Sequence, residues 1–251
     1  MRMTFVKWCG ETCAALLEPQ GAALLEGTFG SWSRTGEVIP PEQIEMTGMP
    51  RPSKVVAVGL NYRQHIEEMG EETHADPVLF LKPASAVIGH GKAIVLPPQS
   101  AQVDFEAELA VVMKKQAKNI TPAQAEEYIL GYTCLNDVTA RDLQKKDGQW
   151  TRAKGFDTFC PIGPIITDEI NPNQVEVKLL QNGVVRQQGN TSMFLVPVQE
   201  LVSYVSSVMT LLPGDVITTG TPSGIGPMHA GDTISVEIEG IGTLTNPVEH
   251  A

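Results

Sequence analysis

The stretch DFEAELAVVM, residues 104–113, places three acidic residues in its first five positions and then continues as an apolar run. Asp104, Glu106 and Glu108 stand at every second position, and the side chains of a β-strand alternate between its two faces. The three carboxylates are therefore predicted to share one face of a strand. The opposite face would carry apolar side chains into a core, namely Ala107, Leu109 and Val111.

Carboxylates about 7 Å apart on one strand face repel each other unless a cation lies among them. Hard oxygen ligands suit Mg²⁺, Mn²⁺ or Ca²⁺ better than zinc. The alternative is a solvent-facing strand of a half-buried sheet, and this stretch alone leaves both open. Asp137, at the end of the apolar strand in CLNDVTARD, supplies another carboxylate that could converge on the same place.

Cationic residues lie at or near the ends of other predicted strands. Arg141 follows Asp137 by four residues, Lys154 lies in TRAKGFDTF, and Lys82 ends the run VLFLK. Each one alone is an ordinary surface residue. Together with a carboxylate metal site they indicate a pocket for an anionic, chelating substrate.

The stretch GLNYRQHIEEMGEE contains the acid–base candidates. His65 and Glu68 are three residues apart on a predicted short helix, so they can hydrogen-bond. A carboxylate beside an imidazole raises its basicity and fixes its tautomer, as the activation of a water molecule requires. The alternative is a surface histidine with acidic neighbours. The glycine and charges of GEETHAD, residues 70–76, predict a mobile lid.

Short β-branched runs separated by glycine and proline turns predict a β-rich α+β fold. A small N-terminal β module, residues 1–50, is expected to precede a larger domain, residues 51–251. Asn182-Gly183 predicts a hairpin turn, and residues 121–132 predict a helix with a threonine N-cap. A Rossmann dinucleotide site is disfavoured, because the glycines of G-x-G-x-x-G are missing after the first apolar run of the larger domain.

Composition disfavours several classes of protein. A net charge of −11 argues against a nucleic-acid partner. No apolar run approaches the ~18 residues of a membrane span, and the N-terminal stretch lacks a signal-peptide core, so a cytoplasmic location is expected. Cys9 and Cys13 lack the further ligands of a zinc site, so the cysteines are expected to be free, buried thiols.

Several segments, in order along residues 50–250, together resemble the fumarylacetoacetate hydrolase family. They are GLNYRQHIEEMG, PVLFLKPASAVIGHG, VDFEAELAVVM, LGYTCLNDVTARDLQ, WTRAKGFDTFCPIGP, RQQGNTSMF and TTGTPSGIGP. Within the family, the sequence resembles the short acylpyruvase and 2-hydroxyhepta-2,4-diene-1,7-dioate isomerase-like members. The resemblance implies a roll of mixed β-sheets around a metal site, a small N-terminal β module, and a homodimer.

The resemblance also implies roles for particular residues. The ligands of Mg²⁺ or Mn²⁺ would be Glu106, Glu108 and Asp137. The catalytic residues would be His65, Glu68 and Lys154. The substrate contacts, carried over more weakly, would be Lys82, Arg141, Gln144 and Thr221. Asp104 would then be a neighbour of the metal site and not a ligand.

A 2-oxo acid that chelates the metal would have its enolate stabilised when a C–C bond breaks or a proton leaves. Hydrolysis of acylpyruvates is the expected activity, because His65 and Glu68 can activate water. The alternative is an isomerase or decarboxylase of 2-oxo or 2-hydroxy-dienoic diacids in aromatic catabolism, or an oxaloacetate decarboxylase or tautomerase. The same histidine–glutamate pair disfavours a non-catalytic metal-dependent binding protein.

Overall fold

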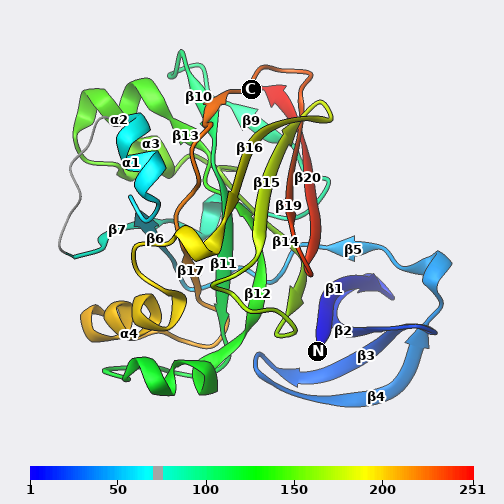
Figure 1. Cartoon of the computed structure of the whole chain (residues 1–251). Helices are drawn as coiled ribbons and strands as arrows, with labels where there is room; N and C mark the ends of the chain where they lie inside the picture. Colours follow the sequence, from blue (N-terminus) through cyan, green and yellow to red (C-terminus); the bar gives the residue numbers. More distant parts are fainter. Residues whose placement is uncertain (70–75) are drawn as a thin grey trace.

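The computed structural model describes residues 1–69 and 76–251. The lid predicted for residues 70–76 therefore lies almost entirely outside the described residues. Strands run through the body of the molecule, three helices gather at one end of them, and one helix lies at the other end (Figure 1). The α-helices are α1 (Arg63–Met69), α2 (Arg141–Asp147), α3 (Thr151–Lys154) and α4 (Val198–Val208). Among the described residues, no helix has the length and apolar character of a membrane span.

The largest sheet among the described residues has twelve strands, ten of which follow one path. Their order is β4 (Ser31–Ile39), β3 (Gly21–Thr28), β2 (Glu11–Glu18), β1 (Arg2–Trp8), β14 (Cys160–Thr167), β12 (Ile129–Asn136), β11 (Ala107–Met113), β17 (Val216–Thr218), β6 (Val55–Gly59) and β7 (Val78–Lys82). Two further strands, β5 (Met46–Thr47) and β8 (Val87–Ile88), pair with β1 and β14. The sheet is mixed, because β17 pairs in parallel with β6 and antiparallel with β11.

Two smaller sheets complete the fold within the described ranges. The five-stranded sheet runs β16 (Val184–Asn190), β15 (Glu176–Gln181), β19 (Thr233–Ile238), β20 (Gly242–His250) and β9 (Ile94–Leu96). The three-stranded sheet runs β13 (Thr139–Ala140), β10 (Val103–Phe105) and β18 (Gly226–Pro227). Short 3₁₀-helices are η1 (Pro41–Gln43), η2 (Ala84–Ala86), η3 (Pro122–Tyr128) and η4 (Thr191–Met193). The β-rich α+β fold is thereby confirmed.

Residues 103–113 are buried at every position, so the alternative of a solvent-facing strand is wrong. Leu109 and Val111 of β11 join the core that also contains side chains of β15 and β19. Ala110 and Val112 enter a second core with side chains of β1 and β14. The strand is interrupted once: β10 ends and β11 begins on either side of Glu106, where the chain passes from the small sheet into the large one.

Local turn signals are confirmed, whereas one helix is shorter than predicted. Asn182 and Gly183 form the β15–β16 turn with positive φ angles of 54° and 79°. Thr121 caps η3 in a capping box with Gln124. The helical pattern continues to residue 132, but the chain becomes β12 at Ile129. Pairing of β12 with both β11 and β14 overrides the local helical preference there.

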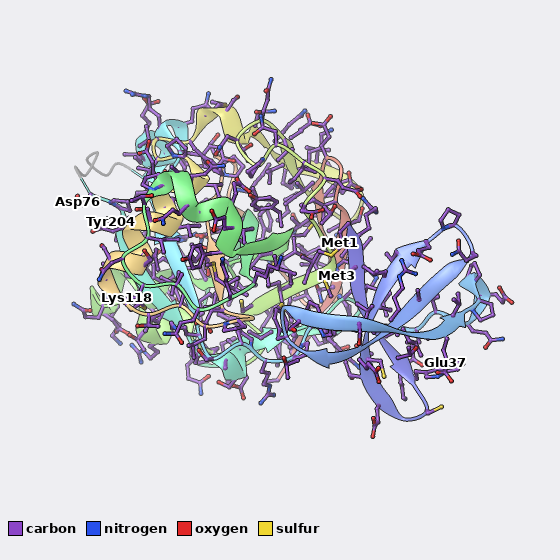
Figure 2. All side chains as sticks on the ribbon, turned by 90° about the horizontal axis from the view of Figure 1, so that it is seen from below. Met1, Met3, Glu37, Asp76, Lys118 and Tyr204 are labelled. Carbon is purple, nitrogen blue, oxygen red and sulfur yellow. The ribbon has the colours of Figure 1, made fainter. Side chains whose placement is uncertain are left out.

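The N-terminal strands protrude from the body, as Figure 2 shows by the position of Glu37 relative to Met1 and Met3 at the junction. They remain part of the large sheet, because β1 pairs antiparallel with β14 and places Met3 opposite Ile166. The N-terminal amine also binds Asp168 at 2.5 Å. The four cysteines are free thiols; Cys134 and Cys160 are buried as expected, whereas Cys9 is exposed and Cys13 is only partly buried.

Candidate active site

Three carboxylates converge where β10 passes into β11. One oxygen from each of Glu106, Glu108 and Asp137 lies within 4.8 Å of the others, and all three side chains are buried. The antiparallel register brings them together: Ala107, the first residue of β11, lies opposite Asn136, the last of β12. The N–H of Asp137 donates to the carbonyl of Glu106 at 2.8 Å. Strand pairing thus joins carboxylates that are distant in sequence.

Two buried lysines bind the same carboxylates. Lys154 Nζ, at the end of α3, donates to Glu106 Oε2 at 2.8 Å and to Asp137 Oδ2 at 2.7 Å. Lys82 Nζ, at the end of β7, donates to Asp137 Oδ1 at 2.5 Å and to the carbonyl of Val138 at 3.2 Å. Lys82 therefore lies behind Asp137, and it is not among the described residues that line the adjacent cavity.

Arg141, the first residue of α2, is held from three sides. Its Nε donates to Asp104 Oδ2 at 2.8 Å, its Nη1 donates to Gln144 Oε1 at 2.6 Å, and its Nη2 donates to Glu106 Oε1. Asp104 is therefore the ion-pair partner that orients Arg141. The sequence reading missed this role, because only the β10–β13 pairing, with Asp104 opposite Thr139, brings the two side chains together.

Glu108 differs from its neighbours because no cation among the described residues pairs with it. Its Oε2 accepts the backbone N–H of Gly220 at 2.8 Å. Burial, and then the charges of Asp137 and Glu106, raise the pKa of Glu108 to about 8. Burial also raises the pKa of Glu106, but the charges of Lys154 and Arg141 outweigh it and hold that pKa below its ordinary value.

The donor set fits a divalent cation. Four acidic groups and three basic groups meet here, which leaves one negative charge uncompensated when all are ionised. The acids are Asp104, Glu106, Glu108 and Asp137, and the bases are Lys82, Arg141 and Lys154. A cation bound by Glu106, Glu108 and Asp137 would relieve the repulsion that raises the pKa of Glu108. Oxygen-only donors suit Mg²⁺ or Mn²⁺.

The histidine and glutamate of α1 form a hydrogen-bonded pair. His65 Nδ1 lies 3.1 Å from Glu68 Oε2, and Glu68 Oε1 accepts the backbone N–H of Gly224 at 2.9 Å. A carboxylate partner places the proton of a neutral imidazole on Nδ1, which leaves Nε2 as the base. His65 is only 6% exposed and lines the same cavity as the three carboxylates.

The cavity has a volume of about 390 Å³. Its polar lining comprises His65, Glu106, Glu108, Asp137, Arg141, Gln144, Lys145, Lys154 and Thr221. Every predicted site residue lines this cavity except Lys82 and Glu68. Lys82 binds Asp137 and Glu68 contacts His65, and both of these partners belong to the lining. Their assigned roles stay predictions.

Gln187 is a fully buried residue to which the sequence analysis gave no role. Its Nε2 donates to Thr221 Oγ1 at 2.9 Å and its Oε1 accepts the N–H of Ala107 at 2.9 Å. The hydroxyl of Thr221 donates in turn to the carbonyl of Ala107 at 2.8 Å. Gln187 therefore fixes the loop that carries Gly220 against β11. The segment RQQGNTSMF, which includes Gln187, belongs to the family pattern, but nothing in its sequence signals this burial.

The fold and the buried carboxylate cluster define an enzyme scaffold of the fumarylacetoacetate hydrolase type, with a group of acidic residues that could hold a metal ion. The chain belongs to this family: the model of the fumarylacetoacetate (FAA) hydrolase C-terminal domain matches residues 54–249. Its members are enzymes, and they include isomerases and tautomerases.

Two solved structures and one curated protein illustrate the relationship. A 5-carboxymethyl-2-hydroxymuconate delta-isomerase from Mycobacterium smegmatis is 45% identical, with TM-score 0.93 and full coverage of both chains. A 2-hydroxyhepta-2,4-diene-1,7-dioate isomerase from Mycobacterium marinum is 45% identical, with TM-score 0.90 and coverage of 100% and 98%. A human mitochondrial oxaloacetate tautomerase is 38% identical over 95% of this chain and 80% of its own.

The raised pKa of Glu108 predicts a pH dependence of stability in protein freed of divalent cations by EDTA. Between pH 4.5 and about 8 the native state retains a proton that the unfolded chain has released. The free energy of unfolding is therefore expected to fall as pH rises through this range, and the fall should be absent from Glu108→Gln. Urea denaturation of both proteins across this range measures the difference. Parallel curves for the two proteins would contradict the assignment.

Proposed function

We propose that this chain is a divalent-metal-dependent enzyme that isomerises 2-oxo acids by moving a proton, as in keto–enol tautomerisation or the shift of a conjugated double bond. The observation that carries the proposal is the placement of His65, oriented by Glu68, on the wall of the cavity that holds the carboxylate cluster. The isomerase and tautomerase names of the relatives support this reaction class.

Mg²⁺ or Mn²⁺, when bound by Glu106, Glu108 and Asp137, would supply a Lewis acid that polarises the keto oxygen and stabilises an enolate. The protein contributes further positive charge at the same end. Arg141 and Lys154 both line the cavity and are both held by Glu106. Preorganised charges in a largely buried site lower the free energy of an anion that forms there.

His65 transfers the proton in this scheme. Its Nε2 accepts a proton from the carbon next to the keto group, and Glu68 stabilises the imidazolium that results. Return of that proton to the substrate oxygen gives the enol, and return to a more distant carbon shifts the double bond. No atom is gained or lost in either case, so the pair is regenerated after each cycle.

Hydrolysis of acylpyruvates is the second candidate, and one observation favours it. Glu68 has 31% side-chain exposure, so solvent reaches the pair that would deprotonate an attacking water. The same enolate would leave when the C–C bond breaks. Decarboxylation of oxaloacetate would form that enolate by loss of CO₂.

One assay series separates these reactions. Oxaloacetate, acetylpyruvate, fumarylpyruvate and a 2-hydroxyhepta-dienedioate are each incubated with Mg²⁺ and with EDTA. The proposal expects Mg²⁺-dependent tautomerisation or isomerisation, detected by ultraviolet absorbance, with the carbon skeleton intact. Pyruvate released from acetylpyruvate at a comparable rate would favour hydrolysis, and CO₂ release would favour decarboxylation. Undiminished turnover in EDTA would contradict metal dependence.

Loss of the base should reduce turnover without removing the binding site. His65→Ala is expected to lower kcat by about 10²–10⁴-fold, which is the usual contribution of a general base, while KM changes little. Glu67→Gln is the matched control, because Glu67 is an exposed neighbour on the same helix. Steady-state kinetics with Mg²⁺ measure both variants. Wild-type kcat in His65→Ala would eliminate the proton-transfer role.

A further inference from the structure

Part of the cavity lining has no role in the proposed chemistry. Beside the carboxylates and the cations that bind them, the lining includes the apolar side chains of Val58, Leu60, Met69, Phe80 and Trp150. One cationic side chain, Lys145, belongs to the lining but is exposed. These residues are available to the part of a substrate that extends away from the reacting 2-oxo acid group.

Helix α2 spans the distance from the carboxylates to the mouth of the cavity. Arg141, Gln144 and Lys145 all line the cavity, because residues three and four positions apart share a helix face. Arg141 and Gln144 are buried, whereas Lys145 is exposed. Four residues of α-helix advance by about 6 Å. Lys145 therefore places a positive charge at the mouth, one helical turn beyond the arginine that binds Glu106.

Phe80 and Trp150 form an aromatic wall of the cavity beside Lys154. Lys154 Nζ lies 5.0 Å from the centroid of the Phe80 ring. The rings of Phe80 and Trp150 meet edge to face, with centroids 5.1 Å apart and an interplanar angle of 74°. Trp150 stands at the start of α3 and Lys154 at its end, with the N–H of Lys154 donating to the carbonyl of Trp150 at 2.9 Å. The aromatic side chains therefore extend from Lys154, which binds the carboxylates, to the half-buried Trp150.

Gly59 allows the indole of Trp150 to close against the end of β6. A Cβ atom at residue 59 would lie 2.9 Å from Trp150 Cζ3 and 3.2 Å from Cη2. Any larger residue would have to displace the ring. The position of Trp150 thus depends on a glycine in the large sheet, which makes the apolar wall a built feature of the fold.

Resting on the proposed function, we infer that Lys145 is a specificity-determining residue that binds a second, distal carboxylate of the substrate. The substrates concerned belong to the diacids that the names of the relatives already suggest, in which an apolar or unsaturated chain separates the two acid groups; the new element is the role of Lys145. The 2-oxo acid end lies at the carboxylate cluster with Arg141. The chain lies along Phe80 and Trp150, and the distal carboxylate pairs with Lys145 at the mouth.

Calorimetric binding to the Mg²⁺-loaded chain tests the inference without turnover. The probes are 2-oxoadipate and 2-oxohexanoate, which have equal chain length and differ in a distal carboxylate or methyl group. The wild-type protein is expected to bind 2-oxoadipate about five-fold more tightly, as befits an ion pair at an exposed position. The preference should disappear in Lys145→Gln and should shrink with added salt.

Two further variants control the test. Lys146→Gln removes the neighbouring positive charge in the last turn of α2. Lys146 is not among the described residues that line the cavity, so this variant should retain the preference for 2-oxoadipate. Trp150→Leu should weaken binding of both acids by a similar factor, because both chains contact the wall.

The inference is overturned if Lys145→Gln keeps the preference, if Lys146→Gln loses it equally, or if the wild-type protein binds the two acids alike or binds neither. Failure of the proposed function is a separate result. A wild-type protein that isomerises no 2-oxo acid with Mg²⁺ would refute the reaction, whereas the calorimetric preference still decides the role of Lys145.

Discussion

The antiparallel pairing of β11 with β12 is the constraint on which the rest of the site depends. It places the start of one strand beside the end of the other, so that Glu106, Glu108 and Asp137 meet in the interior. Buried carboxylates at this spacing are unfavourable unless positive charge compensates them. Three side chains supply this positive charge: Lys82 at the end of β7, Lys154 at the end of α3 and Arg141 at the start of α2.

The negative charges of the three carboxylates are compensated unevenly by the neighbouring cations. Lys154 bridges Glu106 and Asp137, and Lys82 supports Asp137 from behind. No cation among the described residues pairs with Glu108, so burial and the charges of Asp137 and Glu106 raise its pKa to about 8, whereas the pKa of Glu106 falls. Glu108 is thus the carboxylate that gains most from a divalent cation. His65 of α1 lines the same cavity as Glu108, and the proposed proton transfer would take place there.

The grouping of the acidic side chains and the contact between His65 and Glu68 could be predicted from the sequence, because both depend on short-range patterns. Alternation along residues 104–113 placed the acidic side chains on one face, and the three-residue spacing of His65 and Glu68 paired them on a helix. Roles that depend on strand pairing were not readable. Asp104 orients Arg141 only through the β10–β13 register, and Gln187 fixes Thr221 only because β16 lies beside the loop after β17.

The same limit explains the two differences in the fold. The apolar run after η3 has helical spacing, yet it forms β12 because both neighbouring strands pair with it. The acidic strand is buried on both faces. On one face it packs against side chains of the five-stranded sheet, and on the other it packs into a second core with side chains of β1 and β14. Neither partner is visible in the local sequence.

The central claim is that the carboxylate cluster is a divalent-cation site completed by Glu108. Electron paramagnetic resonance of Mn²⁺ titrated into EDTA-treated, desalted protein tests it most directly. The account predicts one bound Mn²⁺ per wild-type chain and loss of that binding in Glu108→Gln. A wild-type chain that binds no Mn²⁺, or a Glu108→Gln variant that binds it with unchanged affinity, would contradict the account.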